Sequence, residues 1–363
     1  MTLEPGIYFG LPEEEYHADP SFSSSGVKDI TVSPLDYWAK SWMNPDKEET
    51  DSSSQKLGKA YHKLILEGRE AFDACYAVKP DKEDFPDALD GAQALKDHCD
   101  TLGLKKSGSI AELCARIREA DAVVQLWPEI EAEFKEEAGA REVLTKKQWR
   151  DLKLVEMVMR RSPSTEKAFV GGVPEVSLFW HERDVPMKAR IDYVKPAGLI
   201  DLKSFANMMD DEIVSAVTKA VARHRYFIQP VVYTTGFDHM KALFKTVGDD
   251  LFHGGNDQER AVLRAALQQP KTKFWFVFLE TSGVPNVVVR EFAEFETYSG
   301  QSATTNAYWY RGWESFKRGL SLYSRFMKEF GPEQPWIADF GLKPFRDEDF
   351  PIWMLNAPME AAE

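Results

Sequence analysis

The sequence predicts an α/β protein whose mixed central sheet is flanked by helices on both faces. Three strand-like runs, 174–182, 185–196 and 198–205, are separated by short polar or Pro/Gly turns, a pattern typical of a β-meander. A continuous apolar run at 273–280 indicates a strand in the middle of the sheet. Helical spacing of apolar residues in much of the remaining chain supplies the covering layers.

The N-terminal part of the chain is expected to be helical with irregular connections. Residues 22–40 predict a short helix, a turn at Ser33 and a second helix, with Ser24 or Ser25 as the cap of the first. Residues 57–68 repeat apolar side chains at helical spacing and end in a glycine, which predicts a further helix.

A small helical unit is expected between two segments of the core. Residues 79–91 are acidic, contain two prolines and resemble a linker. Residues 94–120 predict two short helices around the sequence LGLKKSG, and Ser109 with Glu112 forms a predicted capping box at the second. Residues 127–161 are again helical in pattern and rich in charge.

The remaining elements complete the two helical layers and the sheet. Helices are expected at 209–225, 229–246 and 306–330, and a further strand at 286–295. We therefore divide the chain into an N-terminal part of the core, a helical insertion and the main core, with boundaries 1–85, 86–126 and 127–363.

The composition limits the partners and the compartment. Lys and Arg total 45 against 59 Asp and Glu, a net charge of −14, which argues against a protein that coats nucleic acid non-specifically but leaves room for a local DNA-binding groove. The three cysteines, Cys75, Cys99 and Cys114, fit reduced thiols and are too few for a four-thiolate iron–sulfur cluster. No signal peptide, membrane span or GxxxxGK[ST] loop is recognisable, so we expect a cytoplasmic protein without a P-loop.

Chemistry-bearing residues gather on neighbouring strands of the predicted meander. Asp201 and Lys203 share one strand face because side chains alternate, and Asp192 lies on the strand before, across a tight connection. Glu175, at the start of the first strand, can face the same place. Carboxylate oxygens suit Mg²⁺, which offsets their mutual repulsion. The alternative is a cross-strand salt bridge between Lys203 and either aspartate.

These strands resemble the signature of the PD-(D/E)xK nuclease superfamily. Asp192 followed by Asp201, Leu202 and Lys203 is similar to the motif, with Ile191 where the motif has proline. The resemblance implies a restriction-endonuclease-like core that hydrolyses phosphodiester bonds with a divalent metal ion.

Two further motifs resemble the RecB-type branch of that superfamily. Gln229 and Tyr233 are similar to its QxxxY motif, and Pro230 predicts that the helix begins or bends there. Gly58 and His62 are similar to its GxxxH helix, where a glycine one turn earlier would let another segment approach closely. The run SSSGVKDITVSPLDYW followed by LGKAYHKLILEG resembles the RecE-like (exonuclease VIII type) family common in phages and prophages.

The resemblance implies roles for particular residues. The expected metal ligands are His62, Asp192, Asp201 and the Leu202 carbonyl, with Mg²⁺ bound and Mn²⁺ as a competent substitute. The expected catalytic group is Asp192, Asp201, Lys203, Glu175, Gln229 and Tyr233. The expected DNA contacts are Lys188, Arg190, Ser204, Lys105 and Lys106.

The resemblance also implies an activity, with two alternatives. A RecE-like enzyme would degrade linear double-stranded DNA from 5′ to 3′ as a homo-oligomeric ring, beside a single-strand annealing protein. The insertion resembles a SAP-type DNA-binding module, or it is a helical hairpin that merely packs on the core. A structure-specific or restriction-like endonuclease on the same fold, and a non-catalytic DNA-binding recombination partner, remain the other two classes.

Overall fold

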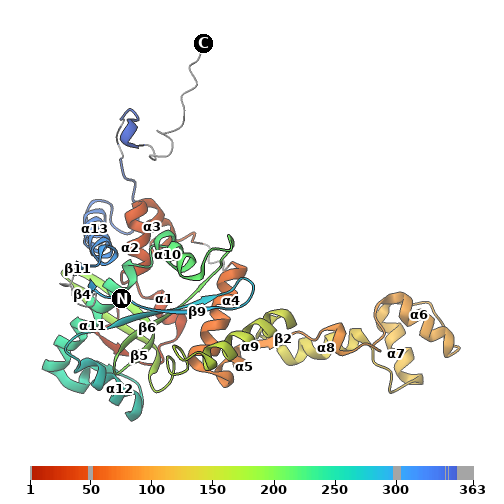
Figure 1. The fold of residues 1–363 in the computed structure, drawn as a ribbon. Coiled ribbons are helices and arrows are strands. Elements are labelled where there is room, and N and C mark those ends of the chain that lie inside the picture. The colour runs from red at the N-terminus through yellow and green to blue at the C-terminus, as the bar shows by residue number, and fades with distance from the viewer. Residues whose placement is uncertain (1, 48–51, 297–303, 340, 342, 350–363) are drawn as a thin grey trace.

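A seven-stranded mixed sheet forms the centre of the protein, as the sequence predicts (Figure 1). The computed structural model describes residues 2–47, 52–296, 304–339, 341 and 343–349. In spatial order the strands are β7 (Phe252–His253), β1 (Gly6–Tyr8), β4 (Val173–Glu182), β5 (Val185–Lys195), β6 (Gly198–Phe205), β8 (Phe274–Glu280) and β9 (Val287–Glu291).

The predicted meander is the antiparallel run β4-β5-β6. Strand β8 pairs with β6 in parallel and with β9 antiparallel, so it has a neighbour on each side, as its continuous apolar run predicts. Along β8 the side chains of Phe274, Phe276 and Phe278 enter one hydrophobic core, whereas Val277 and Leu279 enter another. Both faces of the sheet are therefore covered.

Helices form a layer on each face. The first core contains residues of α2 (Ser24–Val32), α3 (Pro34–Lys40), α10 (Ile213–Arg223), α11 (Ile228–Val247), α12 (Asp257–Leu267) and α13 (Ala307–Phe330). The second contains residues of α4 (Ser53–His62), a π-helix η1 (Lys63–Glu67), α5 (Arg69–Cys75) and α9 (Lys146–Arg161). The short helix α1 (Glu13–Ala18) precedes α2, and small elements complete the fold: η2 (Lys82–Asp84), η3 (Gly248–Leu251), η4 (Asp347–Asp349), β10 (Phe295–Glu296) and β11 (Thr304–Thr305).

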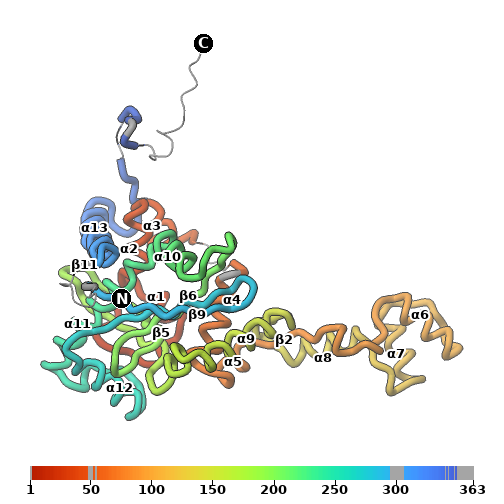
Figure 2. Tube along the Cα trace, in the orientation of Figure 1, coloured from red at the N-terminus to blue at the C-terminus, as the bar shows by residue number. Residues whose placement is uncertain are grey.

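An arm carries the helical insertion away from the sheet. Its base is the parallel pair β2 (Tyr76–Val78) and β3 (Glu142–Leu144), and α6 (Gly91–Thr101) and α7 (Ile110–Ala120) lie at its far end. Figure 2 shows the chain leaving the core after β2 and returning along α8 (Trp127–Ala138). A hydrophobic cluster of its own holds α6 and α7 together, with Leu95, Cys99, Leu113, Cys114, Ile117 and Leu126 buried. The proposed division of the chain at 85/86 and 126/127 stays a prediction.

Three expectations about helix boundaries need correction. The cap of α2 is Ser23, whose side chain accepts from Gly26, and not Ser24 or Ser25. The helix expected at 57–68 begins at Ser53 and turns into a π-helix after His62. The pattern at 127–161 is two helices with β3 between them, because α8 ends at a glycine and Thr145 opens α9 with a capping box.

Candidate active site

The predicted site residues on the meander do come together. Asp192 lies on β5 and Asp201 and Lys203 on the neighbouring strand β6, while Glu175 on β4 stands opposite Asp192 in the β4–β5 register. His62 reaches them from the end of α4, where its Nδ1 lies 3.7 Å from Asp192 Oδ2. The site is therefore built by the sheet centre and by one helix of the N-terminal part of the chain.

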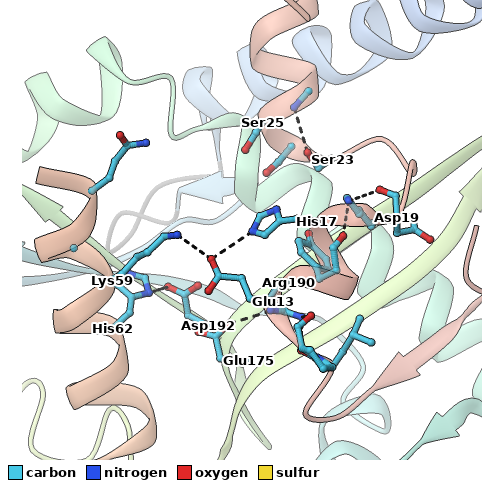
Figure 3. A pocket seen from close by; sticks show the side chains of 18 of the residues that line it. Glu13, His17, Asp19, Ser23, Ser25, Lys59, His62, Glu175, Arg190 and Asp192 are labelled. Carbon is cyan, nitrogen blue, oxygen red and sulfur yellow. Dashed lines mark hydrogen bonds and ion pairs between the residues drawn. The ribbon is translucent and has the colours of Figure 1, made fainter. Parts of the chain in front are cut away.

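Three of these side chains could hold a metal ion. One potential ligand atom from each of His62, Glu175 and Asp192 lies within 4.8 Å of the other two. Figure 3 shows the three side chains converging at the floor of a groove. An imidazole nitrogen beside two carboxylates suits a divalent cation that accepts mixed nitrogen and oxygen ligands. The donor set therefore fits the expected metal.

The two neighbouring carboxyl groups of Glu175 and Asp192 both have raised pKa values. Burial, and then the neighbouring Asp192 carboxylate, raise the pKa of Glu175 to about 8. Burial also raises the pKa of Asp192, although Lys203 and the Leu202 backbone N–H, which donates to Asp192 Oδ2 at 2.7 Å, oppose this rise. A positively charged ligand between the two carboxyl groups would lower both pKa values again.

The backbone at Glu175 is strained. Its φ of +51° lies in the left-handed region, which a residue with a Cβ adopts at a cost of roughly 1 to 3 kcal/mol. The strained residue is the one that faces Asp192, so the protein maintains an unfavourable backbone conformation at the point where two carboxylates meet. Strain of this kind is frequent at functional sites.

Burial keeps the His62 imidazole neutral. Burial, and then the Lys203 ammonium, lower the pKa of His62 to about 4, although Asp201 and a hydrogen bond with the Leu202 backbone oppose the change. A neutral imidazole has a lone pair to offer a metal ion. Leu202 thus adjoins both His62 and Asp192, and coordination through its carbonyl stays a prediction.

Asp201 is engaged differently from the other carboxylates. It is fully buried, its Oδ2 lies 2.6 Å from Lys203 Nζ, and its Oδ1 accepts a hydrogen bond from Gln229 Nε2. Burial and then Asp192 raise the pKa of Asp201 to about 6. Metal binding by Asp201 stays a prediction, since the group formed by His62, Glu175 and Asp192 does not include it.

The QxxxY motif supports this buried pair from α11. Gln229 is the second residue of that helix, Pro230 lies in its first turn as predicted, and a hydrogen bond links Gln229 to the Tyr233 hydroxyl. Burial lowers the pKa of Lys203, but Asp201 and Asp192 outweigh it, so the net pKa is raised and the side chain stays an ammonium. The order Tyr233, Gln229, Asp201, Lys203 is thus a continuous polar chain inside the core.

A groove of about 1020 Å³ is lined by His62, Glu175 and Asp192, the three potential metal ligands. The N-terminal segment lines one side, including Glu13, which lies 3.1 Å from Lys59 on α4, and the strands β4 and β5 line the other. The groove reaches the N-terminal turn of α2 at Ser23 and Ser25.

The expected DNA contacts are distributed unevenly. Lys188 is 7% exposed and donates to the carbonyls of Tyr16 and Asp19, each at 2.6 Å. Arg190 donates to the Ser177 hydroxyl and to a carbonyl of the N-terminal segment, with its Nε 4.0 Å from Glu175. Both line the groove, yet both are occupied in fastening the N-terminal segment to the sheet. Their contact with phosphates stays a prediction.

The other expected contacts lie on β6 and on the arm. Ser204 follows Lys203 and is the nearest neighbour of Gly58, where an added Cβ would lie 3.8 Å from the Ser204 hydroxyl oxygen. That is an ordinary van der Waals distance, so the idea that Gly58 allows a close approach is wrong. Lys105 and Lys106 lie in the turn between α6 and α7, at the far end of the arm, and Lys106 pairs with Asp100 at 2.9 Å.

Sequence reasoning missed Lys28 and Tyr226. The Nζ atom of Lys203 on β6 lies 5.6 Å from the Tyr226 ring centroid, and the Nζ atom of Lys28 on α2 lies 5.5 Å from it. Tyr226 lies three residues before Gln229, so its proximity to the motif was a usable signal. Lys28 carried no such signal, because only the tertiary fold brings α2 to β6.

The match to a protein-family model agrees with this picture. The family described as "PDDEXK-like domain of unknown function (DUF3799)" matches residues 23–243, which include every site residue on the core. A crystal structure from Eubacterium rectale, of a protein provisionally named an exonuclease, aligns over 96% of this chain and 97% of its own, with 13% identity and a TM-score of 0.44. That similarity is too low to support a conclusion about activity. A search of curated proteins found no match. Among the described residues, no helix is both long and apolar enough to cross a membrane.

Proposed function

Because the chain belongs to the PDDEXK-like family, we propose that it is a divalent-metal-dependent deoxyribonuclease that hydrolyses phosphodiester bonds of linear double-stranded DNA. The observation that carries the proposal is the grouping of His62, Glu175 and Asp192 beside the buried Asp201–Lys203 pair. A salt bridge on a solvated face, the alternative for Lys203, does not account for a fully buried Asp201 or for three ligand groups that converge.

The proposed mechanism assigns each side chain one task. His62, Asp192 and Glu175 would hold the metal ion, with Asp201 and the Leu202 carbonyl as the further predicted ligands. Bound there, Mg²⁺ or Mn²⁺ would lower the pKa of a water molecule and neutralise charge on the scissile phosphate.

Lys203 would act on the reacting atoms. Its ammonium keeps its proton and its side chain is 18% exposed, so Lys203 would donate to the attacking water or to a phosphate oxygen whose charge grows in the transition state. Gln229 and Tyr233 would act through Asp201, by fixing the carboxylate that orients Lys203.

The finer parts of the proposal come from the RecE-like resemblance. They are exonuclease rather than endonuclease action, 5′ to 3′ direction, a homo-oligomeric assembly, an annealing partner and a cytoplasmic location. DNA binding by the insertion belongs with them, on the basis of its SAP-like pattern.

The test compares end-labelled linear DNA with covalently closed circular DNA, in Mg²⁺ or EDTA. Wild type should degrade the linear DNA in Mg²⁺, spare the circle and be inactive in EDTA. Lys203→Met should lower the rate by about 10² to 10³-fold, the cost of losing one transition-state contact. Lys273→Met, which removes an exposed lysine at the start of β8, is the matched control and should retain the rate.

Each other outcome points to a different conclusion. Cleavage of the closed circle would assign an endonuclease. DNA binding without hydrolysis in any divalent metal would assign a non-catalytic DNA-binding protein. Full activity of Lys203→Met would refute the role given to Lys203.

A further inference from the structure

The ammonium of Lys28 and that of Lys203 lie over the same aromatic ring, Tyr226. Lys28 on α2 and Lys203 on β6 each lie within 5.6 Å of the Tyr226 ring centroid, so their nitrogens are no more than about 11 Å apart. The His224 ring stacks on Tyr226 at 5.3 Å. Three segments distant in sequence therefore meet beside the Asp201–Lys203 pair.

Among the residues that the structure describes, Lys28 has no carboxylate in direct contact, although the charges of Asp201 and Asp29 act on it from further away. Within the described part of the chain no carboxylate oxygen lies within 4.0 Å of its Nζ, and the adjacent Asp29 pairs with Lys40 at 2.9 Å. Lys203, in contrast, forms an ion pair with Asp201. Burial, and then the Lys203 charge, lower the pKa of Lys28 to about 8. A half-buried cation beside another cation is unfavourable unless an anion binds to both.

A strained turn fixes this arrangement. Arg225 has a φ of +53° and donates to the Lys28 carbonyl at 3.0 Å and to the Thr31 hydroxyl at 2.9 Å. These bonds tie α2 to the segment before α11, and they place Arg225 close to Lys28. The cluster of Lys28, Lys203 and Arg225 is basic, whereas the groove floor is acidic.

We propose that Lys28 binds a backbone phosphate of the DNA strand that passes through the site, one or two nucleotides from the phosphate at Lys203. The inference rests on the proposed nuclease function. A strand advances about 3.4 Å along the axis per nucleotide and also winds around that axis, so its phosphates are further apart than this advance, and a separation of up to about 11 Å accommodates one or two nucleotides. The contact is to phosphate oxygens and is independent of base sequence.

The experiment measures DNA binding and hydrolysis separately. Binding of a short fluorescent linear duplex is titrated in EDTA over a series of NaCl concentrations, and steady-state hydrolysis is measured in Mg²⁺. Lys28→Met should weaken binding about 10-fold, reduce the slope of log K against log salt by about 0.9, and raise KM about 10-fold with kcat within about threefold of wild type. Lys28→Arg keeps the charge and should restore both constants to within about threefold.

The matched control is Lys245→Met. This exposed lysine lies on α11 sixteen residues after Gln229, about 24 Å along the helix, and its removal changes the net charge equally. Lys28→Met behaving like Lys245→Met in both assays would overturn the inference, as would a loss confined to kcat or a failure of Lys28→Arg to restore binding. If wild type binds DNA in a Lys28-dependent way but hydrolyses none, the inference holds and the proposed nuclease function fails. If wild type does neither, both fail.

Discussion

Replacing Glu175 by glutamine should stabilise the protein when no metal is bound. The Glu175 carboxyl faces Asp192, and burial with that neighbouring charge raises its pKa from an ordinary 4.5 to about 8. The folded protein therefore binds a proton at Glu175 that the unfolded chain releases above pH 4.5. Between pH 4.5 and 8 the unfolded state binds fewer protons, so the stability of wild type falls as pH rises.

The size of the effect follows from these values. At pH 7 the pH exceeds the pKa of Glu175 in the unfolded chain by 2.5 units. At 1.36 kcal/mol per unit, the wild-type protein has lost about 3 kcal/mol of its free energy of unfolding relative to the acid end. Glutamine has the same shape without the titration, so Glu175→Gln removes this cost. With an unfolding entropy of about 2.1 cal/mol/K per residue over 363 residues, the gain corresponds to about 4 °C in Tm.

The assay is thermal unfolding in EDTA from pH 4.5 to pH 8. The variant and wild type should coincide at the acid end and separate as pH rises, with the variant more stable. Glu133→Gln, an exposed change on α8, should follow wild type throughout. Adding Mn²⁺ at pH 7 should stabilise wild type more than Glu175→Gln, because the variant lacks one ligand. A variant no more stable than wild type at pH 7 in EDTA would refute the account of the carboxylate pair.

Two further predictions concern packing around the site. Gln229→Leu should lower the nuclease rate, and it should lower the free energy of unfolding by about 1 to 3 kcal/mol, because it leaves the buried Asp201 Oδ1 without its hydrogen-bond donor. An unchanged free energy of unfolding in a denaturant titration would contradict this contact. Gly236→Ala should destabilise the protein by about 1 to 3 kcal/mol, because the added Cβ would lie 2.7 Å from the buried Trp180 ring, whereas Gly58→Ala should be tolerated. Equal melting temperatures of the two variants would argue against this packing.

Most of the sheet and the centre of the site could be predicted because their signals are local. Alternation in 185–205 is sufficient to place Asp201 and Lys203 on one face, and the short connection after β5 forces Asp192 onto the adjacent strand. Pro230 could be placed in the first turn of its helix because its ring excludes it from a helix interior.

The rest of the site depends on contacts between distant segments. Nothing in the sequence around Glu175 indicates a positive φ, which the surrounding sheet imposes. Lys28 reaches Tyr226 only because α2 packs against α11 and α13 in the first core. The division of 127–161 into two helices was predictable in principle, since Gly139 and the Thr145 capping box are local signals, but the continuous helical period on both sides obscured them.

The base of the arm has a consequence for how this protein can vary. In the parallel pair β2–β3, Tyr76 lies beside Glu142 and Val78 beside Leu144, so the chain departs and returns within about 10 Å. None of the groups assigned to the metal or to Lys28 lies in residues 79–141. Residues 79–141 could therefore be shortened or replaced in an engineered variant while the residues assigned to the metal and to Lys28 stay in the core.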